Sequence, residues 1–213
     1  MMQDERLYRH EYKYLVSNTE IEVIKNRIKG IMKKDPHAVN GIYNIRSLYF
    51  DDYDDSCLYE NINGTGPKMK YRIRIYNHDD SRISLECKHR DKGKTFKEHK
   101  LITKEECVDM INGKYMSHLN LIPRVIVEYD RIPFVYNAGN VRVTFDTNLS
   151  SSTEITRFLE DKISRRPVMP LSINLMEVKW DEFIPDYIYK ALEIDNLQQT
   201  TYSKYYLCRE YSL

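Results

Sequence analysis

The heptapeptide KYRIRIY, residues 70–76, alternates cationic and apolar side chains. In a β-strand successive side chains point to opposite faces, so Lys70, Arg72 and Arg74 share one face, and the tyrosine and isoleucines share the other. Such a row of cations is ordinary where a sheet faces water. Inside a protein it is costly unless an anion accompanies it. The fold and the function both depend on which of these two environments applies.

The composition fits a single domain, residues 1–213, with a sizeable core and many charges to place. Hydrophobic residues make up 41% of the chain and charged residues 31%. The 33 basic and 32 acidic residues nearly cancel, which argues against a general nucleic-acid-binding protein. Seven glycines and seven prolines leave little material for flexible linkers, and 18 tyrosines favour strands.

Nothing in the sequence indicates secretion or a membrane span. The first residues, MMQDERLYRHEYKYLV, are charged where a signal peptide is apolar, and no run approaches the roughly 18 apolar residues of a spanning helix. The cysteines are far apart and lack the CxxC or Cys/His spacing of a zinc site; they are Cys57, Cys87, Cys107 and Cys208. We therefore expect a cytoplasmic protein with reduced cysteines.

Alternating or β-rich segments predict about eight strands, joined mostly as antiparallel hairpins by short polar separators such as NHDD and DKGK. These strands are expected at 5–16, 42–52, 68–77, 81–90, 94–102, 124–136, 141–149 and 174–183.

Three or four helices are expected between these strands. The capping box SNTE at 17–20 and the isoleucines after it predict a helix over 18–33. A second capping box, TKEE at 103–106, predicts a short helix, and DYIYKALEI predicts one at 186–194. A polar stretch with room for a helical turn leads to the turn sequence NGTGP at 63–67, and residues 150–172 show no clear pattern.

The same division into a charged and an apolar face recurs from strand to strand. The charged faces mix both signs and consist of Glu11 with Lys13, Arg72 with Arg74, Glu86 with Lys88 and Arg90, Lys97, Arg142 with Asp146, and Glu177 with Lys179. For Lys97 the alternation is ambiguous, because Glu98 and Lys100 could equally form the charged face.

Two architectures explain this pattern. Solvated charged faces would leave the apolar faces to form a sandwich core, and for any one strand this is the commoner arrangement. Alternatively the strands close into a barrel with a polar interior, and helices cover the apolar exterior. The apolar stripes of the predicted helices need a surface to cover, and the charged faces concentrate Arg, Lys and Glu rather than Ser, Thr, Asn and Gln. Both features favour the barrel.

A set of motifs in order along the chain then gives a resemblance. HEYKYLV, IRSLYFDD, KYRIRIY, LECKHR, TFK, VEYDR, VRVTFDTNL, LMEVKW and YSKYY together resemble the VTC domain, the polyphosphate-polymerase domain of the vacuolar transporter chaperone family, within the triphosphate tunnel metalloenzyme superfamily. The resemblance implies an α+β fold: a closed antiparallel β-barrel that forms a polar tunnel, with helices outside. It also implies transfer of the γ-phosphoryl group of ATP to polyphosphate with Mn²⁺ or Mg²⁺.

The resemblance also assigns residues. It implies that the tunnel cations bind the phosphates and serve catalysis, and these are Lys13, Arg72, Arg74, Lys88, Lys97 and Arg142, with Ser203 and Lys204 at the end of the domain. Arg90 and Lys179 complete the expected substrate-binding set, although Arg90 stands where fungal members carry a histidine. Glu177 matches the metal-binding glutamate. The roles of Glu11, Glu86 and Asp146, in orienting cations or helping to bind metal, stay open.

Three functions remain at this point. The first is a polyphosphate polymerase whose partners are ATP and polyphosphate, with no nucleic acid and no direct membrane insertion, and with any membrane-protein partner unknown. The second is a tunnel triphosphatase. The third is a non-catalytic polyphosphate sensor, and Glu177 argues against it because a protein that only binds polyphosphate has less need for a metal-binding carboxylate. Neither GxGxxG nor GxxxxGK[ST] occurs, so a nucleotide would be held through its triphosphate rather than by a glycine-rich loop.

Overall fold

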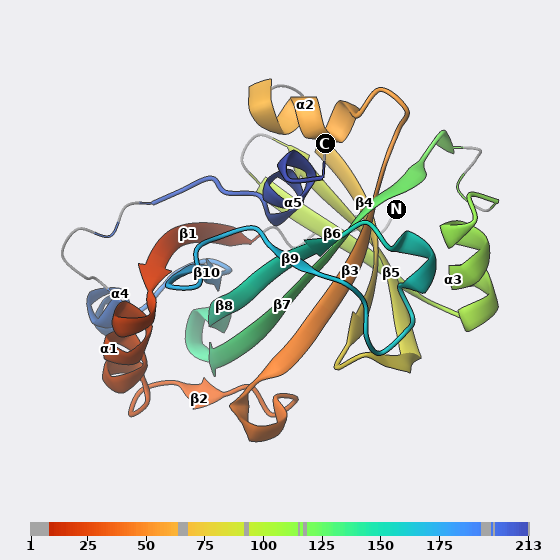
Figure 1. Cartoon of the computed structure of the whole chain (residues 1–213). Coiled ribbons are helices and arrows are strands. Elements are labelled where there is room, and N and C mark those ends of the chain that lie inside the picture. The colour runs from red at the N-terminus through yellow and green to blue at the C-terminus, as the bar shows by residue number, and fades with distance from the viewer. Residues whose placement is uncertain are drawn as a thin grey trace, which may run out of the picture.

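The computed structural model describes residues 9–63, 68–91, 94–114, 116, 119–192, 197 and 199–212 (Figure 1). Its helices are α1 (Asn18–Ile28), α2 (Ser56–Asn63), α3 (Lys104–Ile111), α4 (Asp186–Leu192) and α5 (Lys204–Glu210). The long strands are β1 (His10–Ser17), β3 (Tyr43–Asp51), β4 (Lys68–Tyr76), β5 (Asp79–Asp91), β6 (Lys94–Ile102), β7 (Ile122–Tyr136), β8 (Val141–Ser152) and β10 (Ile173–Trp180), and two short ones are β2 (Lys33–Lys34) and β9 (Arg166–Pro167).

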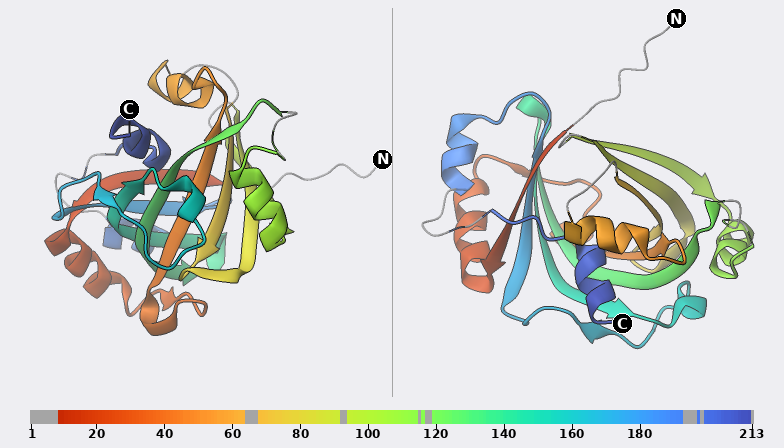
Figure 2. Two further views of the ribbon diagram at one scale, coloured as in Figure 1. Left: turned by 45° about the vertical axis from the view of Figure 1, so that its right-hand side comes forward. Right: turned by 90° about the horizontal axis from the view of Figure 1, so that it is seen from above.

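All ten strands belong to one antiparallel sheet. Its hydrogen-bonded order is β1-β10-β8-β7-β3-β4-β5-β6, with β2 added to β7 and β9 added to β8. In the view from above, the sheet curves so that β1 and β10 stand on one side and β5 and β6 on the other (Figure 2). The α+β class and the antiparallel sheet are confirmed. Along the described strands the path is open between β1 and β6, so closure of a barrel is not confirmed.

The apolar face of the sheet points outward and is covered by helices. Ile21, Ile24 and Ile28 of α1 pack with Val143 and Met176 on β8 and β10, and α4 lies beside α1. On the opposite side of the sheet, α3 packs against the outer face of β3, β4 and β5 (Figure 2). The sandwich alternative is therefore wrong for this chain, because the apolar faces do not meet each other.

The C-terminal helix α5 is the exception, because it packs on the inner face. Tyr205, Leu207 and Cys208 are buried against Val125 and Val127 of β7. The sequence YSKYYL is too short and too aromatic to show helical periodicity, and this helix was not predicted. Its start is nevertheless ordinary, since Ser203 is the N-cap and its hydroxyl accepts a hydrogen bond from the Tyr206 N–H.

The capping boxes are confirmed, but the end of the first helix is wrong. Ser17 and Glu20 cap α1 reciprocally, as Thr103 and Glu106 cap α3. The helix predicted to residue 33 ends at Ile28, because the chain turns at Gly30 and then adds Lys33–Lys34 as a strand on β7. The helical turn predicted before NGTGP is α2. Residues 64–67 of NGTGP and residues 5–8 of the first predicted strand lie outside the described part.

The described helices include none that is both long enough and apolar enough to cross a membrane.

The buried carboxylate of Asp51 joins α2 and α5 to the sheet. Asp51, at the end of β3, is 0% exposed and accepts hydrogen bonds from the Cys57 and Leu58 N–H groups of α2 at 2.9 and 3.1 Å. It also accepts one from the Tyr205 hydroxyl of α5 at 2.5 Å. Asp51 thus fixes α2 and α5 to the same point of the sheet.

Replacing Asp51 with alanine should therefore lower the free energy of unfolding by about 3 kcal/mol, because several buried donors lose their acceptor at once. Urea denaturation followed by circular dichroism measures this. Asp54→Ala, at an exposed aspartate of the same loop, is the matched control and should change stability by less than about 0.5 kcal/mol. Equal stability of the two variants would contradict the anchoring role of Asp51.

Candidate functional site

The inner face of the sheet encloses a cavity of about 640 Å³. Its lining comes from β1, β3, β4, β5, β6, β7, β8 and β10 and from the start of α5. Basic side chains dominate it: Arg9, Lys13, Lys70, Arg72, Arg74, Lys88, Lys97, Arg131, Arg142, Lys179 and Lys204. Within the described chain, Glu11 and Glu177 are the acidic lining residues. The strand faces that alternate in sequence therefore converge on one strongly positive space.

The strand register brings like charges directly opposite one another. Lys70 on β4 is the partner of Lys88 on β5, and Lys88 is the partner of Lys97 on β6. Directly opposed side chains on an antiparallel sheet lie close together, and like charges in these positions destabilise the sheet. The three lysines therefore form one row of like charge on the wall of the cavity, which a bound anion would stabilise.

Glu86 holds the cations of the β4–β6 wall. Its carboxylate, only 3% exposed, accepts from Arg72 Nε at 2.7 Å, lies 3.7 Å from Arg74 Nη1 and pairs with Lys97. Burial by itself would raise the pKa of Glu86, but Arg72, Arg74 and Lys97 hold it well below its usual range. One carboxylate therefore orients three cations and leaves a net positive charge facing the cavity.

Glu11 on β1 likewise holds several cations, and these come from both β1 and β10 and from β5 on the opposite wall. Its carboxylate lies 3.4 Å from Lys13 Nζ, 3.1 Å from Lys88 Nζ and 3.8 Å from Lys179 Nζ. The pair with Lys88 links β1 to β5, across the part of the sheet where backbone pairing is absent among the described strands. Removal from bulk water lowers the pKa of Lys88 to about 8, in spite of Glu11, and Lys13 and Lys179 add to the effect.

A third cluster lies on β8 and β10, where Asp146 and Glu177 are diagonal neighbours on the inner face. Arg131 of β7 donates two hydrogen bonds to Asp146, at 2.6 and 2.7 Å. The Lys204 ammonium lies 2.6 Å from Asp146 and 2.5 Å from Glu177. Burial would raise the pKa of Glu177, but Lys179, Lys204 and Arg131 hold it well below its usual range, so it is an anion at neutral pH.

Arg142 lies apart from these clusters and is held at its own end of the cavity. Its Nη2 donates to Asp35 at 3.0 Å and to the Tyr43 hydroxyl at 2.6 Å. Burial would raise the pKa of Asp35, but hydrogen bonds from His37 and the charge of Arg142 lower it. The carboxylate therefore fixes the guanidinium of Arg142, which lines the cavity.

Several of these cations lie over tyrosine rings. Lys204 Nζ lies 5.0 Å and the Arg131 guanidinium carbon 5.3 Å from the centre of the Tyr129 ring, and the Arg72 guanidinium carbon 5.6 Å from that of Tyr49. The electron-rich face of an aromatic ring attracts a cation without neutralising it. These contacts hold the cations in place and leave their charge available to a ligand.

The structure brings nearly all of the predicted residues together. The cavity lining includes Lys13, Arg72, Arg74, Lys88, Lys97, Arg142, Glu177, Lys179, Ser203 and Lys204. The ambiguity at Lys97 is resolved, because Glu98 pairs with His89 and Lys100 with Glu106 on the other side of the strand. The Arg90 side chain lies outside the described part, so its expected contact with substrate stays a prediction.

Sequence reasoning missed Arg131, Lys70 and Asp35 as functional candidates. Lys70 belongs to the KYRIRIY motif, and Arg131 follows Val127 and Tyr129 on one face of its strand, so alternation alone could have indicated both. Asp35 reaches Arg142 only through the tertiary fold and carries no such signal in the sequence.

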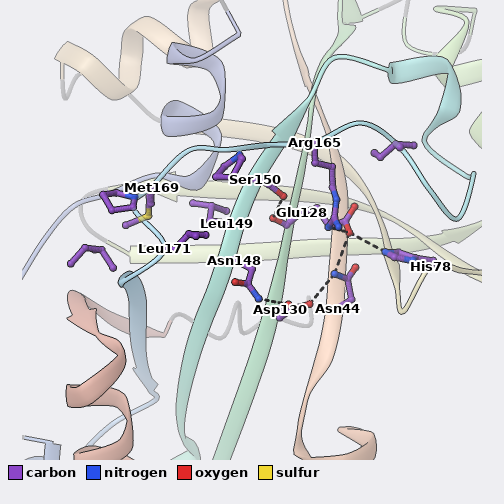
Figure 3. Close-up of a pocket in the computed structure, with 14 residues that line it drawn as sticks. Asn44, His78, Glu128, Asp130, Asn148, Leu149, Ser150, Arg165, Met169 and Leu171 are labelled. Atoms are coloured by element: carbon purple, nitrogen blue, oxygen red, sulfur yellow. Dashed lines mark hydrogen bonds and ion pairs between the residues drawn. The ribbon is translucent and has the colours of Figure 1, made fainter.

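A second cavity, of about 660 Å³, lies on the outer face of β3, β7 and β8, next to the segment that connects β8 to β10 (Figure 3). Its charged groups are largely satisfied by one another. The fully buried Glu128 pairs with Arg46 at 2.6 Å and with Arg165, and lies 3.0 Å from His78 Nε2. Arg46 also donates to the carbonyl oxygens of Phe158 and Asp161, both at 3.0 Å. This network fastens the segment after β8 to the sheet.

The inner cavity can accept a divalent cation only together with other ligands. Among the described residues no three His, Cys, Asp or Glu side chains are grouped to hold a metal ion. Asp146 and Glu177 present two carboxylates, and the hydroxyl of Thr144, directly opposite Glu177, is buried without a hydrogen-bond partner in the described chain. Oxygen donors of this kind suit Mn²⁺ or Mg²⁺, with phosphate oxygens and water as the other ligands.

Comparison with known proteins identifies the class of this fold and site. The VTC domain family matches residues 8–120 and 111–212, nearly the whole chain, so this chain belongs to the VTC domain family. The search of curated proteins found no match.

Solved structures of low sequence identity share the fold. A Hippeastrum protein, described as an adenylyl cyclase candidate with a dominant triphosphatase activity, is 12% identical with a TM-score of 0.54, over 97% of each chain. A conserved hypothetical protein from Pyrococcus furiosus is 11% identical with a TM-score of 0.50, over 89% of this chain and 94% of its own. At these identities the likeness concerns the fold alone.

The lowered pKa of Lys88 predicts how phosphate binding depends on pH. Below pH 8 the side chain is charged, and above pH 8 it loses its proton, so the affinity for tripolyphosphate should fall by up to about tenfold per pH unit as the pH rises. Isothermal titration calorimetry between pH 7 and 9.5 measures this. Lys88→Arg keeps its charge over this range and should flatten the profile, whereas identical profiles would contradict the assignment.

Proposed function

We propose that this chain is a metal-dependent phosphotransferase that lengthens inorganic polyphosphate with the γ-phosphoryl group of ATP inside the inner cavity. The observation that carries the proposal is the in-register row Lys70, Lys88 and Lys97, with Arg72 and Arg74 beside it, on the wall of the inner cavity. Such a wall suits a ligand with a negative charge on every repeating unit. Membership of the VTC domain family supports the same substrate.

The arginines and the lysines of the cavity would have different roles. Arginine binds phosphate through a fork of donors and lysine through a compact charge, so Arg72, Arg74 and Arg142 would fix the orientation of the phosphates. The lysines would neutralise them. Phosphoryl transfer needs little covalent chemistry from the protein, but it needs the attacking and leaving oxygens in line. Glu86 and Glu11 would hold the cations in the positions that this alignment requires.

Glu177, together with Asp146, would contact the metal. A bound Mn²⁺ or Mg²⁺ would neutralise charge on the phosphate oxygens. The protein supplies a pair of carboxylates that stay ionised because Arg131, Lys179 and Lys204 surround them. Ser203 begins α5 and accepts a hydrogen bond from Lys70 at 3.3 Å, so it ties the end of the lysine row to the helix that carries Lys204.

We also propose that the cavity is a tunnel. A single domain of residues 1–213 would close the sheet into a tunnel around its substrate, with the Glu11–Lys88 ion pair between β1 and β5 as the contact that spans the open side. A tunnel suits a polymer because the growing chain can leave at one end. ATP would be held through its triphosphate, so selectivity for the base would be weak.

A second function, hydrolysis of tripolyphosphate or of a nucleoside triphosphate, is favoured by the position of α5. This helix packs on the inner face, and its N-cap Ser203 and first residues Lys204 and Tyr205 line the cavity. A helix start that occupies part of the cavity wall would leave less room for a long product. The triphosphatase activity described for the Hippeastrum protein of the same fold is consistent with this alternative.

Incubation with ATP and Mn²⁺, followed by a polyphosphate gel and a free-phosphate assay, separates these functions. Polymerase activity should give a ladder of chains, and Arg74→Ala should reduce its rate about a hundredfold, because one cation of the transition state is removed. Glu177→Gln should reduce it at least as much. Lys100→Ala, which removes an equal charge from the outer side of β6, should leave the rate unchanged.

Each other outcome has a definite meaning. Free phosphate without chains would replace the polymerase by the triphosphatase. Tight polyphosphate binding with neither product would contradict both enzymes and leave the binding protein that the sequence also allowed.

A further inference from the structure

The Lys204 ammonium lies between Glu177, which lines the inner cavity, and the buried carboxylate of Asp146 beside it. Its Nζ is 2.6 Å from Asp146 Oδ2 and 2.5 Å from Glu177 Oε1, and the side chain is 10% exposed. Asp146 and Glu177 are on neighbouring strands, whereas Lys204 comes from the first turn of α5. The helix therefore places a cation where the two strands present their carboxylate oxygens.

This position is also the one that a divalent cation would prefer. Mn²⁺ and Mg²⁺ bind carboxylate oxygens, and two such oxygens that converge on one ammonium can converge on a metal ion instead. The buried hydroxyl of Thr144, which lacks a hydrogen-bond partner within the described residues, lies directly across the strand pair from Glu177. It offers a further oxygen donor to water or phosphate at the same place.

The charges around the pair prevent a metal ion from simply being added. Glu177 already has Lys204 at 2.5 Å, Lys179 at 3.0 Å and Arg131 at 3.5 Å, and Asp146 has Arg131 and Lys204. A divalent cation placed beside these groups would meet three positive charges around two negative ones. It can bind well only if Lys204 leaves, and Lys204 leaves readily only if another anion accepts its charge.

We propose that Lys204 occupies the metal position in the substrate-free protein, and that the metal ion binds between Asp146 and Glu177 only when phosphate draws Lys204 away. The inference rests on the proposed function of the same cavity. It assigns Asp146 as a second metal-binding carboxylate and makes the metal site conditional on substrate. Lys204 would pass from the carboxylates to the phosphates, which the long flexible side chain of a lysine permits.

Mn²⁺ binding measured by the electron paramagnetic resonance signal of the free ion tests this without any turnover. For the wild-type protein, Mn²⁺ alone should bind weakly, and tripolyphosphate should strengthen the binding beyond what tripolyphosphate does in a solution without protein. Lys204→Gln should bind Mn²⁺ alone at least about tenfold more tightly than the wild type, because the competing ammonium is gone. Adding Asp146→Asn to that variant should remove the gain.

Lys97→Gln is the matched control, since it removes a lysine that pairs with a different carboxylate, Glu86, in the same cavity. It should leave Mn²⁺ binding without phosphate unchanged. An equal gain in this variant would mean that general positive charge, and not Lys204, excludes the metal, and would overturn the proposal. So would a Lys204→Gln protein with wild-type affinity for Mn²⁺.

The wild-type titrations keep the test independent of how the variants fold. Equal Mn²⁺ affinity with and without tripolyphosphate would overturn the proposal even if Lys204→Gln were unstable. Failure of the proposed function has a different signature, because it would show as a lack of products from ATP while the conditional binding of Mn²⁺ with tripolyphosphate stayed intact.

Discussion

The placement of Lys70, Lys88 and Lys97 directly opposite one another on three neighbouring strands is the constraint on which the inner face depends. A sheet normally avoids like charges in directly opposed positions. Here the fold tolerates them because Glu86 and Glu11 each hold several of the surrounding cations, and because part of the charge is left for a ligand. The same arrangement explains the apolar exterior, since a sheet whose inner face is given over to charge must bury its other face under helices.

The carboxylates determine where each cation points. Glu86, Glu11 and the pair Asp146 and Glu177 each hold several cations, with Lys179 shared between Glu11 and Glu177, and Asp35 holds Arg142. The cavity therefore has four anchored regions rather than one diffuse positive surface. Burying a carboxylate is costly, and Glu86, Glu11, Asp146 and Glu177 are each compensated by more than one cation. Apart from Lys204, which we propose moves when phosphate binds, these cations are held in place before substrate binds, as an in-line phosphoryl transfer would require of the groups around it.

The sequence allowed the faces of the strands to be predicted, because alternation fixes which side chains share a face whatever the sheet does afterwards. It also allowed the start of α1 and α3 to be predicted from their capping boxes. The end of α1, the curvature of the sheet and the position of α5 depend on tertiary contacts, such as the pairing of Lys33–Lys34 with β7. Arg131 was missed although it follows the alternation, and Asp35 was missed because it meets Arg142 only in the folded chain.

The choice between polymerase and triphosphatase therefore turns on α5 more than on the cations. Both proposed reactions would use the same basic walls, and they would differ in whether water or a phosphate chain is the acceptor. The helix is fixed to the end of β3 by Tyr205 through Asp51 and to the loop after β3 by Arg209 through Asp55, and it supplies Lys204 to the carboxylates. A helix anchored at two points is a stable part of the cavity wall, whereas its first residue, Lys204, is the part that phosphate would displace in our proposal. Chain growth inside the proposed tunnel would require that the product leave on the side that α5 does not occupy.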